Sequence, residues 1–111
     1  MRIAINERFG GFCLPWDIEE KVEKLIPAWN EDDYQYRPDE RLIKCLYEHG
    51  VDENGHVVNT SALVIVDIPD DVTDWMITDY DGFETLYYVI NGKIYYVSHG
   101  KTYNAGRESY R

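Results

Sequence analysis

The sequence has too few cysteines to build a covalent framework. Cys13 and Cys45 are its two cysteines, no Cys-x-x-Cys pair occurs, and no histidine lies close enough to either residue to suggest a zinc motif. A disulfide scaffold and a zinc module are therefore excluded. Cys45 lies beside Leu46 in a helical pattern, so we expect it to act as a small apolar residue of the core.

Long apolar stretches are missing too. No run approaches the roughly 20 residues that a membrane-spanning helix needs. The short apolar start, residues 1–5, is followed at once by Asn6, Glu7 and Arg8, so it lacks the core of a signal peptide. We therefore expect a cytoplasmic protein that does not bind a membrane.

Basic residues are scarce relative to acidic ones. The 111 residues include 11 Lys and Arg against 21 Asp and Glu, which gives a formal net charge of -10. Non-specific nucleic-acid binding depends on Lys and Arg that neutralise phosphates, so direct binding to nucleic acid is not expected. An excess of acid most often keeps a protein soluble, and it can also imitate DNA toward a DNA-binding protein. The length suits a single domain with one core.

Catalytic motifs are absent as well. The sequence has no phosphate-binding glycine motif, no Gly-x-Ser-x-Gly and no His-Glu-x-x-His. His49, His56 and His99 all fall near turns or at the end of a predicted helix. The acidic cluster at residues 31–33 lacks the spacing of a calcium loop and is typical of a solvated turn. We therefore predict a protein that is not an enzyme and that carries neither a metal nor a cofactor.

Aromatic side chains, by contrast, are abundant. Ten Tyr, three Trp and three Phe make up 14% of the chain. Tyr and Trp combine a large apolar body with one polar group, which suits a surface that is wet at some times and covered at others. Two interpretations stay open: the large side chains fill a thin core, or they form a surface for a partner or ligand.

Local patterns predict an α+β fold with a mostly antiparallel sheet, two short helices and a C-terminal β-hairpin. Apolar residues recur at helical spacing over residues 17–26 and again between Pro38 and Gly50, which suit the two ends of a helix. Strand-forming runs cover residues 2–6, 61–67, 75–80, 86–90 and 93–97. We expect residues 1–98 to form a single domain and residues 99–111 to be a polar, flexible tail.

The clearest local signal is Asn91-Gly92 between two β-rich runs, which is typical of a two-residue type I′ hairpin. In that register Tyr88 faces Tyr95, and Tyr87 faces Tyr96 on the opposite side. Both sides of the hairpin are therefore aromatic. We expect the helices to cover one side and a second subunit to cover the other, so the protein is predicted to be a homo-oligomer.

A second turn signal is the segment Arg8-Phe9-Gly10-Gly11-Phe12. Adjacent glycines permit positive φ and let a backbone or a ligand approach closely. The segment is either a simple tight turn or a cradle of backbone N–H groups for an anion, with Arg8 beside it to supply positive charge. We expect it to contribute to a pocket or an interface, with at least one of its two phenylalanine rings buried.

Three segments of the sequence share a pattern with one known family. They are Arg2-Ile3-Ala4-Ile5-Asn6 with Phe9-Gly10-Gly11-Phe12 and Leu14, then Arg37, Asp39, Leu42-Ile43, Gly50 and Asn54-Gly55, and finally Ile65-Val66-Asp67-Ile68-Pro69-Asp70-Asp71-Val72 with Trp75, Ile77 and Tyr80-Asp81-Gly82. Over residues 2–83 the chain thereby resembles a family of small bacteriophage proteins of uncharacterised function. It departs from the family at Glu7, where a basic residue is usual, and in the Asn-Gly hairpin, which looks like an extension.

The resemblance implies a phage origin, hence the cytoplasm of an infected host cell, and no established activity. Small phage proteins without catalytic motifs often act against host defences, and several from unrelated families sequester cyclic-nucleotide or ADP-ribose signals. The leading hypothesis is therefore a non-enzymatic counter-defence protein that binds and sequesters a small anionic nucleotide. Its site would use Arg8, Gly10 and Gly11 for phosphate, Phe9 or Phe12 for base stacking, and Arg37 for a second charge.

The alternative hypothesis is an acidic, tyrosine-rich inhibitor that mimics DNA and blocks a host defence enzyme. A small hydrolase stays open as a third class, with no residue to name for it. The distribution of acidic side chains over the surface distinguishes the two main hypotheses. A continuous acidic face supports mimicry, whereas a basic, aromatic pocket within an acidic shell supports nucleotide binding.

Overall fold

The computed structural model describes residues 1–60 and 62–105 and confirms the α+β class. In chain order the elements are β1 (Arg2–Asn6), α1 (Trp16–Leu25), the 3-10 turn η1 (Tyr34–Tyr36), α2 (Glu40–His49), β2 (Leu63–Asp67), β3 (Asp74–Tyr80), β4 (Phe83–Ile90), β5 (Lys93–Ser98) and β6 (Lys101–Asn104). Strands β1 and β2 form a two-stranded ribbon, and β3 to β6 form a separate four-stranded sheet. The paired strands run antiparallel throughout these residues.

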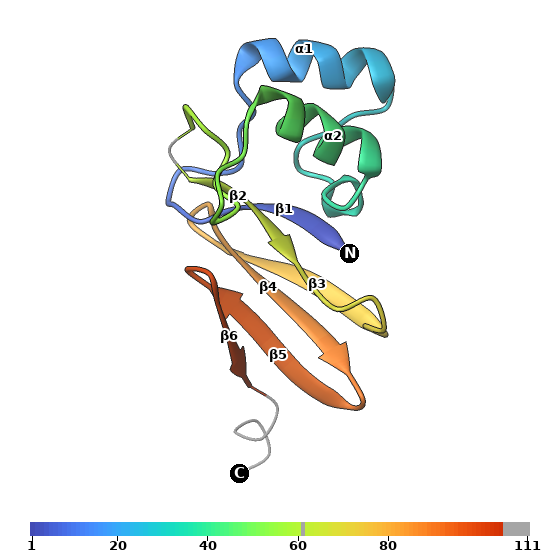
Figure 1. Ribbon diagram of the computed structural model, residues 1–111, viewed down its shortest axis with the longest axis vertical. Helices are drawn as coiled ribbons and strands as arrows, with labels where there is room; N and C mark the ends of the chain where they lie inside the picture. Colours follow the sequence, from blue (N-terminus) through green and yellow to red (C-terminus); the bar gives the residue numbers. More distant parts are fainter. Residues whose placement is uncertain (61, 106–111) are drawn as a thin grey trace.

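The elements form three layers along an elongated molecule of 46 × 26 × 25 Å. Figure 1 shows α1 and α2 together at one end, the β1–β2 ribbon in the middle and the four-stranded sheet at the other end. The ribbon therefore lies between the helices and the sheet, and it contacts both.

Two apolar clusters form on the two sides of the ribbon, because successive side chains of a strand point to opposite faces. Ala4 packs with the helices, and so do Leu63 and Ile65 of β2, in what we call the helix-side cluster. Ile3 and Ile5 instead pack with residues of the four-stranded sheet, in what we call the sheet-side cluster. The core is thus divided in two, and each half depends on the same pair of strands.

Both helices are short and lie within a residue or two of their predicted bounds. α2 follows Asp39, whose carboxylate accepts a hydrogen bond from the Arg41 amide at 2.9 Å, and it ends at Gly50 with φ 130. An aspartate of this kind at an N-cap stabilises a helix by about 1 kcal/mol. Neither helix of the described segments has the length and apolarity that crossing a bilayer requires.

The four-stranded sheet is a meander joined by three two-residue turns. Asp81-Gly82, Asn91-Gly92 and His99-Gly100 all have positive φ at both positions, as type I′ turns require. The predicted hairpin register is confirmed, with Tyr88 opposite Tyr95 and Tyr87 opposite Tyr96.

Strand β6 lies within residues 99–111, where we expected a flexible tail. The His99-Gly100 turn returns the chain onto β5, so that Tyr103 lies opposite Tyr96. The expectation of a tail from residue 99 onward is therefore corrected for residues 101–104, which belong to the sheet. Residues 106–111 of that segment lie outside the described part of the chain.

The helices do not cover the four-stranded sheet, contrary to our expectation. One face of the sheet packs through Leu86, Tyr88 and Val97 against the ribbon, which separates it from the helices. On the opposite face Met76 and Tyr103 are exposed. The ribbon thus takes the place that we assigned to the helices.

Candidate functional site

The glycine segment at residues 8–12 packs against the turn between β3 and β4. The Gly10 amide donates a hydrogen bond to the Asp81 carbonyl at 3.0 Å. The contact at Gly82 is so close that a Cβ added there would lie 2.0 Å from the Gly11 nitrogen. The glycines therefore serve a close approach between two parts of the backbone, and the Gly10 N–H is not free to bind an anion.

Asn6 links the same two segments through its side chain. Its Nδ2 donates to the Arg8 carbonyl at 2.6 Å and to the Gly82 carbonyl at 2.9 Å. Because Asn6 is buried, these bonds hold the glycine segment in one place relative to the β3–β4 turn.

The two phenylalanines of the segment have different surroundings. Phe12 is 8% exposed and belongs to the helix-side cluster, which confirms the expectation that at least one ring is buried. Phe9 is 62% exposed, although its ring lies 5.7 Å from that of Phe83 and 6.2 Å from that of Tyr80. Phe9 is therefore accessible to a ligand, and Phe12 is not.

Arg37 is buried and already paired, so it does not supply the accessible second charge that we expected. Its side chain is 1% exposed, and its two terminal nitrogens donate to the Glu84 carboxylate at 2.6 and 2.8 Å. The guanidinium also lies 3.6 Å from the centre of the Phe12 ring. This bidentate pair occupies both terminal nitrogens of the arginine, while its buried Nε has no hydrogen-bond partner within the described residues. Arg37 is thus part of the core.

Glu84, which sequence reasoning missed, completes this buried network. Its Oε1 also accepts a hydrogen bond from the backbone N–H of Asn6 at 2.9 Å. The only local signal was its position in β4, because alternation from Leu86 and Tyr88 places Glu84 on the inward face. Of the predicted ligand residues, Arg8 and Phe9 therefore stay accessible, and Arg8 has no ion pair within the described residues.

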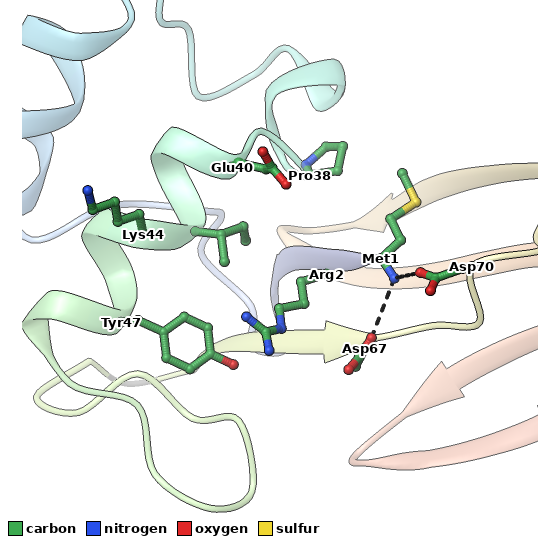
Figure 2. A pocket seen from close by; sticks show the side chains of 9 residues that line it. Met1, Arg2, Pro38, Glu40, Lys44, Tyr47, Asp67 and Asp70 are labelled. Carbon is green, nitrogen blue, oxygen red and sulfur yellow. Dashed lines mark hydrogen bonds and ion pairs between the residues drawn. The ribbon is translucent and has the colours of Figure 1, made fainter.

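A groove of about 660 Å³ lies elsewhere, between α2 and the start of the β1–β2 ribbon (Figure 2). Its size is within the usual range for small-molecule sites. It is lined by Met1, Arg2, Pro38, Glu40, Ile43, Lys44, Tyr47, Asp67 and Asp70. The lining comes from the start of β1, from α2 and the proline before it, and from the end of β2 with the loop that follows.

Two of the acidic groups in the groove are engaged by the chain's own amino terminus. The Met1 ammonium lies 2.8 Å from an Asp70 oxygen and 3.5 Å from an Asp67 oxygen, as the dashed lines in Figure 2 show. The hydrogen bond with Asp70 raises the pKa of the amine, and the same contact lowers the pKa of Asp70. These groups therefore stay charged and mutually compensated near neutral pH.

The two remaining cations of the groove, Arg2 and Lys44, have no ion pair within the described residues. The Arg2 guanidinium lies 5.1 Å from the centre of the Tyr47 ring, and Figure 2 shows the two side chains next to each other. Tyr47 is 44% exposed, so part of its ring is open to solvent. Glu40 is the one carboxylate of the groove without a cationic partner among the same residues.

The described residues contain no group of three or more His, Cys, Asp or Glu side chains arranged to hold a metal ion. No family model matches this chain, and no curated protein or solved structure matches it either. A functional assignment therefore depends on the geometry of the groove and of the open surfaces.

Proposed function

We propose that this protein is a non-catalytic binding protein that sequesters a small anionic nucleotide in the groove between α2 and β1. The observation that carries the proposal is a groove that holds two cations without an ion pair, Arg2 and Lys44, with the Arg2 guanidinium over the partly exposed ring of Tyr47. Other cations of the described residues, Arg8 and Lys24 among them, also lack an ion pair, so the weight of the observation lies in Arg2 and Lys44 lining one groove together with Tyr47.

Arg2 and Lys44 suit the phosphate of such a ligand. Arginine binds phosphate oxygens in a bidentate manner, and lysine binds them as a point charge. Arg2 belongs to β1 and Lys44 to α2, and both line the groove. In Figure 2 the Lys44 side chain extends away from Arg2, so Lys44 must turn toward the groove for one anion to contact both residues.

Tyr47 suits the base. Aromatic side chains contribute about 1–3 kcal/mol per stacked base, whichever base it is. The Arg2 guanidinium now lies over this ring. In the complex we expect Arg2 to turn toward the phosphate and the base to take its place on the ring.

The charge of the groove favours this site over the glycine segment. The Met1 ammonium, Arg2 and Lys44 balance Glu40, Asp67 and Asp70, so the groove is neutral overall while the chain carries -10. Arg8 stands without a second free cation, since Arg37 is bonded to Glu84. The bacteriophage and counter-defence setting of the proposal rests on the sequence resemblance alone.

Titration of the protein by calorimetry with ADP-ribose, cyclic AMP and a cyclic dinucleotide tests the proposal. The variants are Arg2→Ala, Lys44→Ala and Tyr47→Ala in the groove and Arg8→Ala in the glycine segment. Lys24→Ala is the control, because Lys24 is an exposed lysine on α1 that does not line the groove. Loss of a charge-assisted contact costs about 1.5–3 kcal/mol, so Arg2→Ala and Lys44→Ala should weaken binding by roughly 10- to 100-fold. Lys24→Ala should bind like the wild type.

Two outcomes contradict the proposal in different ways. Binding that is lost in Arg8→Ala but retained in Arg2→Ala would locate the ligand at the glycine segment. Absence of binding for every nucleotide would reject sequestration, and the acidic inhibitor of a host defence enzyme would then be the better hypothesis. Melting temperatures of the same samples show whether a variant is folded.

A further inference from the structure

The open face of the four-stranded sheet carries a continuous row of large side chains. Met76, Tyr87, Tyr96 and Tyr103 lie opposite one another on β3, β4, β5 and β6 in turn. The Tyr87 and Tyr96 rings are 5.6 Å apart, and those of Tyr96 and Tyr103 are stacked at 5.0 Å. We call these four residues the tyrosine row.

The surface beside the tyrosine row is hollowed and mostly apolar. A hollow of about 310 Å³ lies over the strands next to the row, and Val89 and Ile94 are among the residues that line it. Exposed apolar surface that continues across several strands is uncommon on a protein that stays single in solution, and it usually marks an interface.

Few charges lie on this face. Alternation along the strands places two ionisable side chains, other than tyrosines, on the same side as the tyrosine row: Asp74 on β3 and Lys101 on β6. This holds for the sheet as described, residues 74–104. Asp74 precedes Met76 by two residues on the edge strand β3, and Lys101 precedes Tyr103 by two residues on the edge strand β6. Because β3 and β6 run in opposite directions, Asp74 and Lys101 lie on opposite sides of the tyrosine row. They therefore occupy diagonally opposite corners of the face.

We propose that this face binds the same face of a second copy of the chain, related by a two-fold axis. Two chains of charge -10 repel each other, so they can associate only through a surface where few like charges meet. A two-fold axis in the plane of contact, perpendicular to the line from Asp74 to Lys101, exchanges the two corners. It thereby brings Asp74 of each copy to Lys101 of the other, as an isologous interface requires.

The inference is independent of the nucleotide groove. The groove lies between α2 and the ribbon, and the ribbon and the sheet separate it from the tyrosine row. The nucleotide groove of each copy would stay open in the dimer. Failure of one proposal therefore leaves the other unaffected.

Sedimentation equilibrium of the full chain at tens of micromolar tests the inference. The wild type should have twice the 13.1 kDa chain mass. Tyr103→Glu places a charge within the contact, and Asp74→Lys or Lys101→Asp brings like charges together, so each should weaken the dimer at least about tenfold. The double variant Asp74→Lys with Lys101→Asp restores opposite charges and should restore the dimer. Asp71→Lys, the same charge change at an exposed residue outside the sheet, should behave like the wild type.

A wild type that sediments as a monomer would overturn the inference. A dimer that is equally stable in Tyr103→Glu and in Asp74→Lys would overturn it too, since the contact would then lie elsewhere. A double variant that stays monomeric while melting like the wild type would reject the two-fold arrangement. Asp74 and Lys101 are exposed, so their variants remain informative even if Tyr103→Glu fails to fold.

Discussion

Arg37 and Glu84 are buried together as an ion pair. The carboxylate accepts hydrogen bonds from two guanidinium nitrogens and from the backbone N–H of Asn6, while the Arg37 Nε has no hydrogen-bond partner within the described residues. Removing one member of a buried ion pair leaves the other charge without a partner, which costs about 3–5 kcal/mol. A substitution at Arg37 therefore tests folding, although we expected this residue to contact a ligand.

Glu31 is half-buried, and one of its carboxylate oxygens lacks such support. Its Oε2 is shielded from solvent and has no hydrogen-bond partner within the described residues. Burial raises the pKa of its carboxyl group, and the charges of Glu19 and Asp32 add to the effect, while Arg37 opposes it. A carboxyl group whose pKa is raised in the folded state is more easily ionised when unfolded. Ionisation of Glu31 therefore lowers the free energy of unfolding. This loss is absent at pH values below the pKa of the unfolded state and complete at pH values above the pKa of the folded state.

Glu31→Gln should accordingly stabilise the protein at pH 7, because a neutral amide is easier to bury than a carboxylate. We expect the melting temperature of the variant to exceed that of the wild type at this pH. The gain should disappear as the pH falls below about 4, where the glutamate is protonated in both states. Thermal melts between pH 3.5 and pH 7.5 measure it.

Glu23→Gln is the matched control, since Glu23 is exposed on α1 and loses the same charge. A gain in Glu31→Gln that equals the gain in this control would mean that net charge, and not burial, is responsible. A gain that is constant with pH would reject the explanation by ionisation.

At the scale of the elements, the turns of the meander differ in what surrounds them. Gly82 and Gly92 both occupy the second position of a type I′ turn, with φ of 88 and 75. A Cβ at Gly92 would meet no atom within 4 Å, whereas one at Gly82 would collide with the Gly10 and Gly11 backbone. Gly92 is thus required for its positive φ alone, whereas Gly82 is required both for its positive φ and for close packing against the glycine segment.

Gly92→Ala should destabilise the protein by about 1–2 kcal/mol, which is the cost of a left-handed conformation for alanine. Gly82→Ala should cost about 2 kcal/mol more, because the glycine segment must also move away. Urea denaturation of both variants measures the difference. Equal losses would show that residues 8–12 do not pack on this turn in solution.

The sequence predicts the elements better than it predicts their contacts. Asn91-Gly92 fixes a hairpin because the turn geometry alone determines the register on both sides of it. The His99-Gly100 turn was missed, although both of its residues have positive φ, because histidine is a weaker turn signal than asparagine. The pairing of β1 with β2 has no local signal at all, since both strands read as isolated apolar runs.

The candidate site was predictable only in part for the same reason. The glycine segment was recognised as a point of close approach, and the structure has it against Gly82. Whether an arginine is free or paired depends on residues far away in the chain, such as Glu84 for Arg37. The groove at Arg2 and Lys44 likewise joins two elements that no sequence pattern relates.

At the scale of the whole molecule, the ribbon makes the two apolar clusters depend on each other. Ile3 and Ile5 belong to one cluster, and Ala4 between them belongs to the other. Loss of β1 would remove residues from both clusters at once. The chain should therefore unfold in a single cooperative transition, although its core is divided.

Single-tryptophan variants can measure this cooperativity. Trp29 packs against the helix-side cluster, Trp75 packs against the sheet-side cluster, and Trp16 is 73% exposed. One variant keeps Trp29 and the other keeps Trp75, with phenylalanine at the remaining tryptophan positions. In each variant the fluorescence melt should coincide with the melt followed by far-UV circular dichroism. A cluster whose fluorescence changes at a lower temperature than the dichroism would show that the two halves unfold separately.

The position of β1 in the ribbon also sets a sequence of events during synthesis. β1 leaves the ribosome before every other element of the fold, yet its strand partner β2 follows only after both helices. The backbone N–H of Asn6 gains its partner later still, because that partner is the carboxylate of Glu84, 78 residues further along the chain. The meander from β3 to β6, by contrast, needs only neighbours that emerge within a few residues, and local pairings of this kind form fastest. A nascent chain that ends before β2 can therefore pair its helices while Ile3 and Ile5 stay uncovered, and the fold closes only when its last strands meet its first.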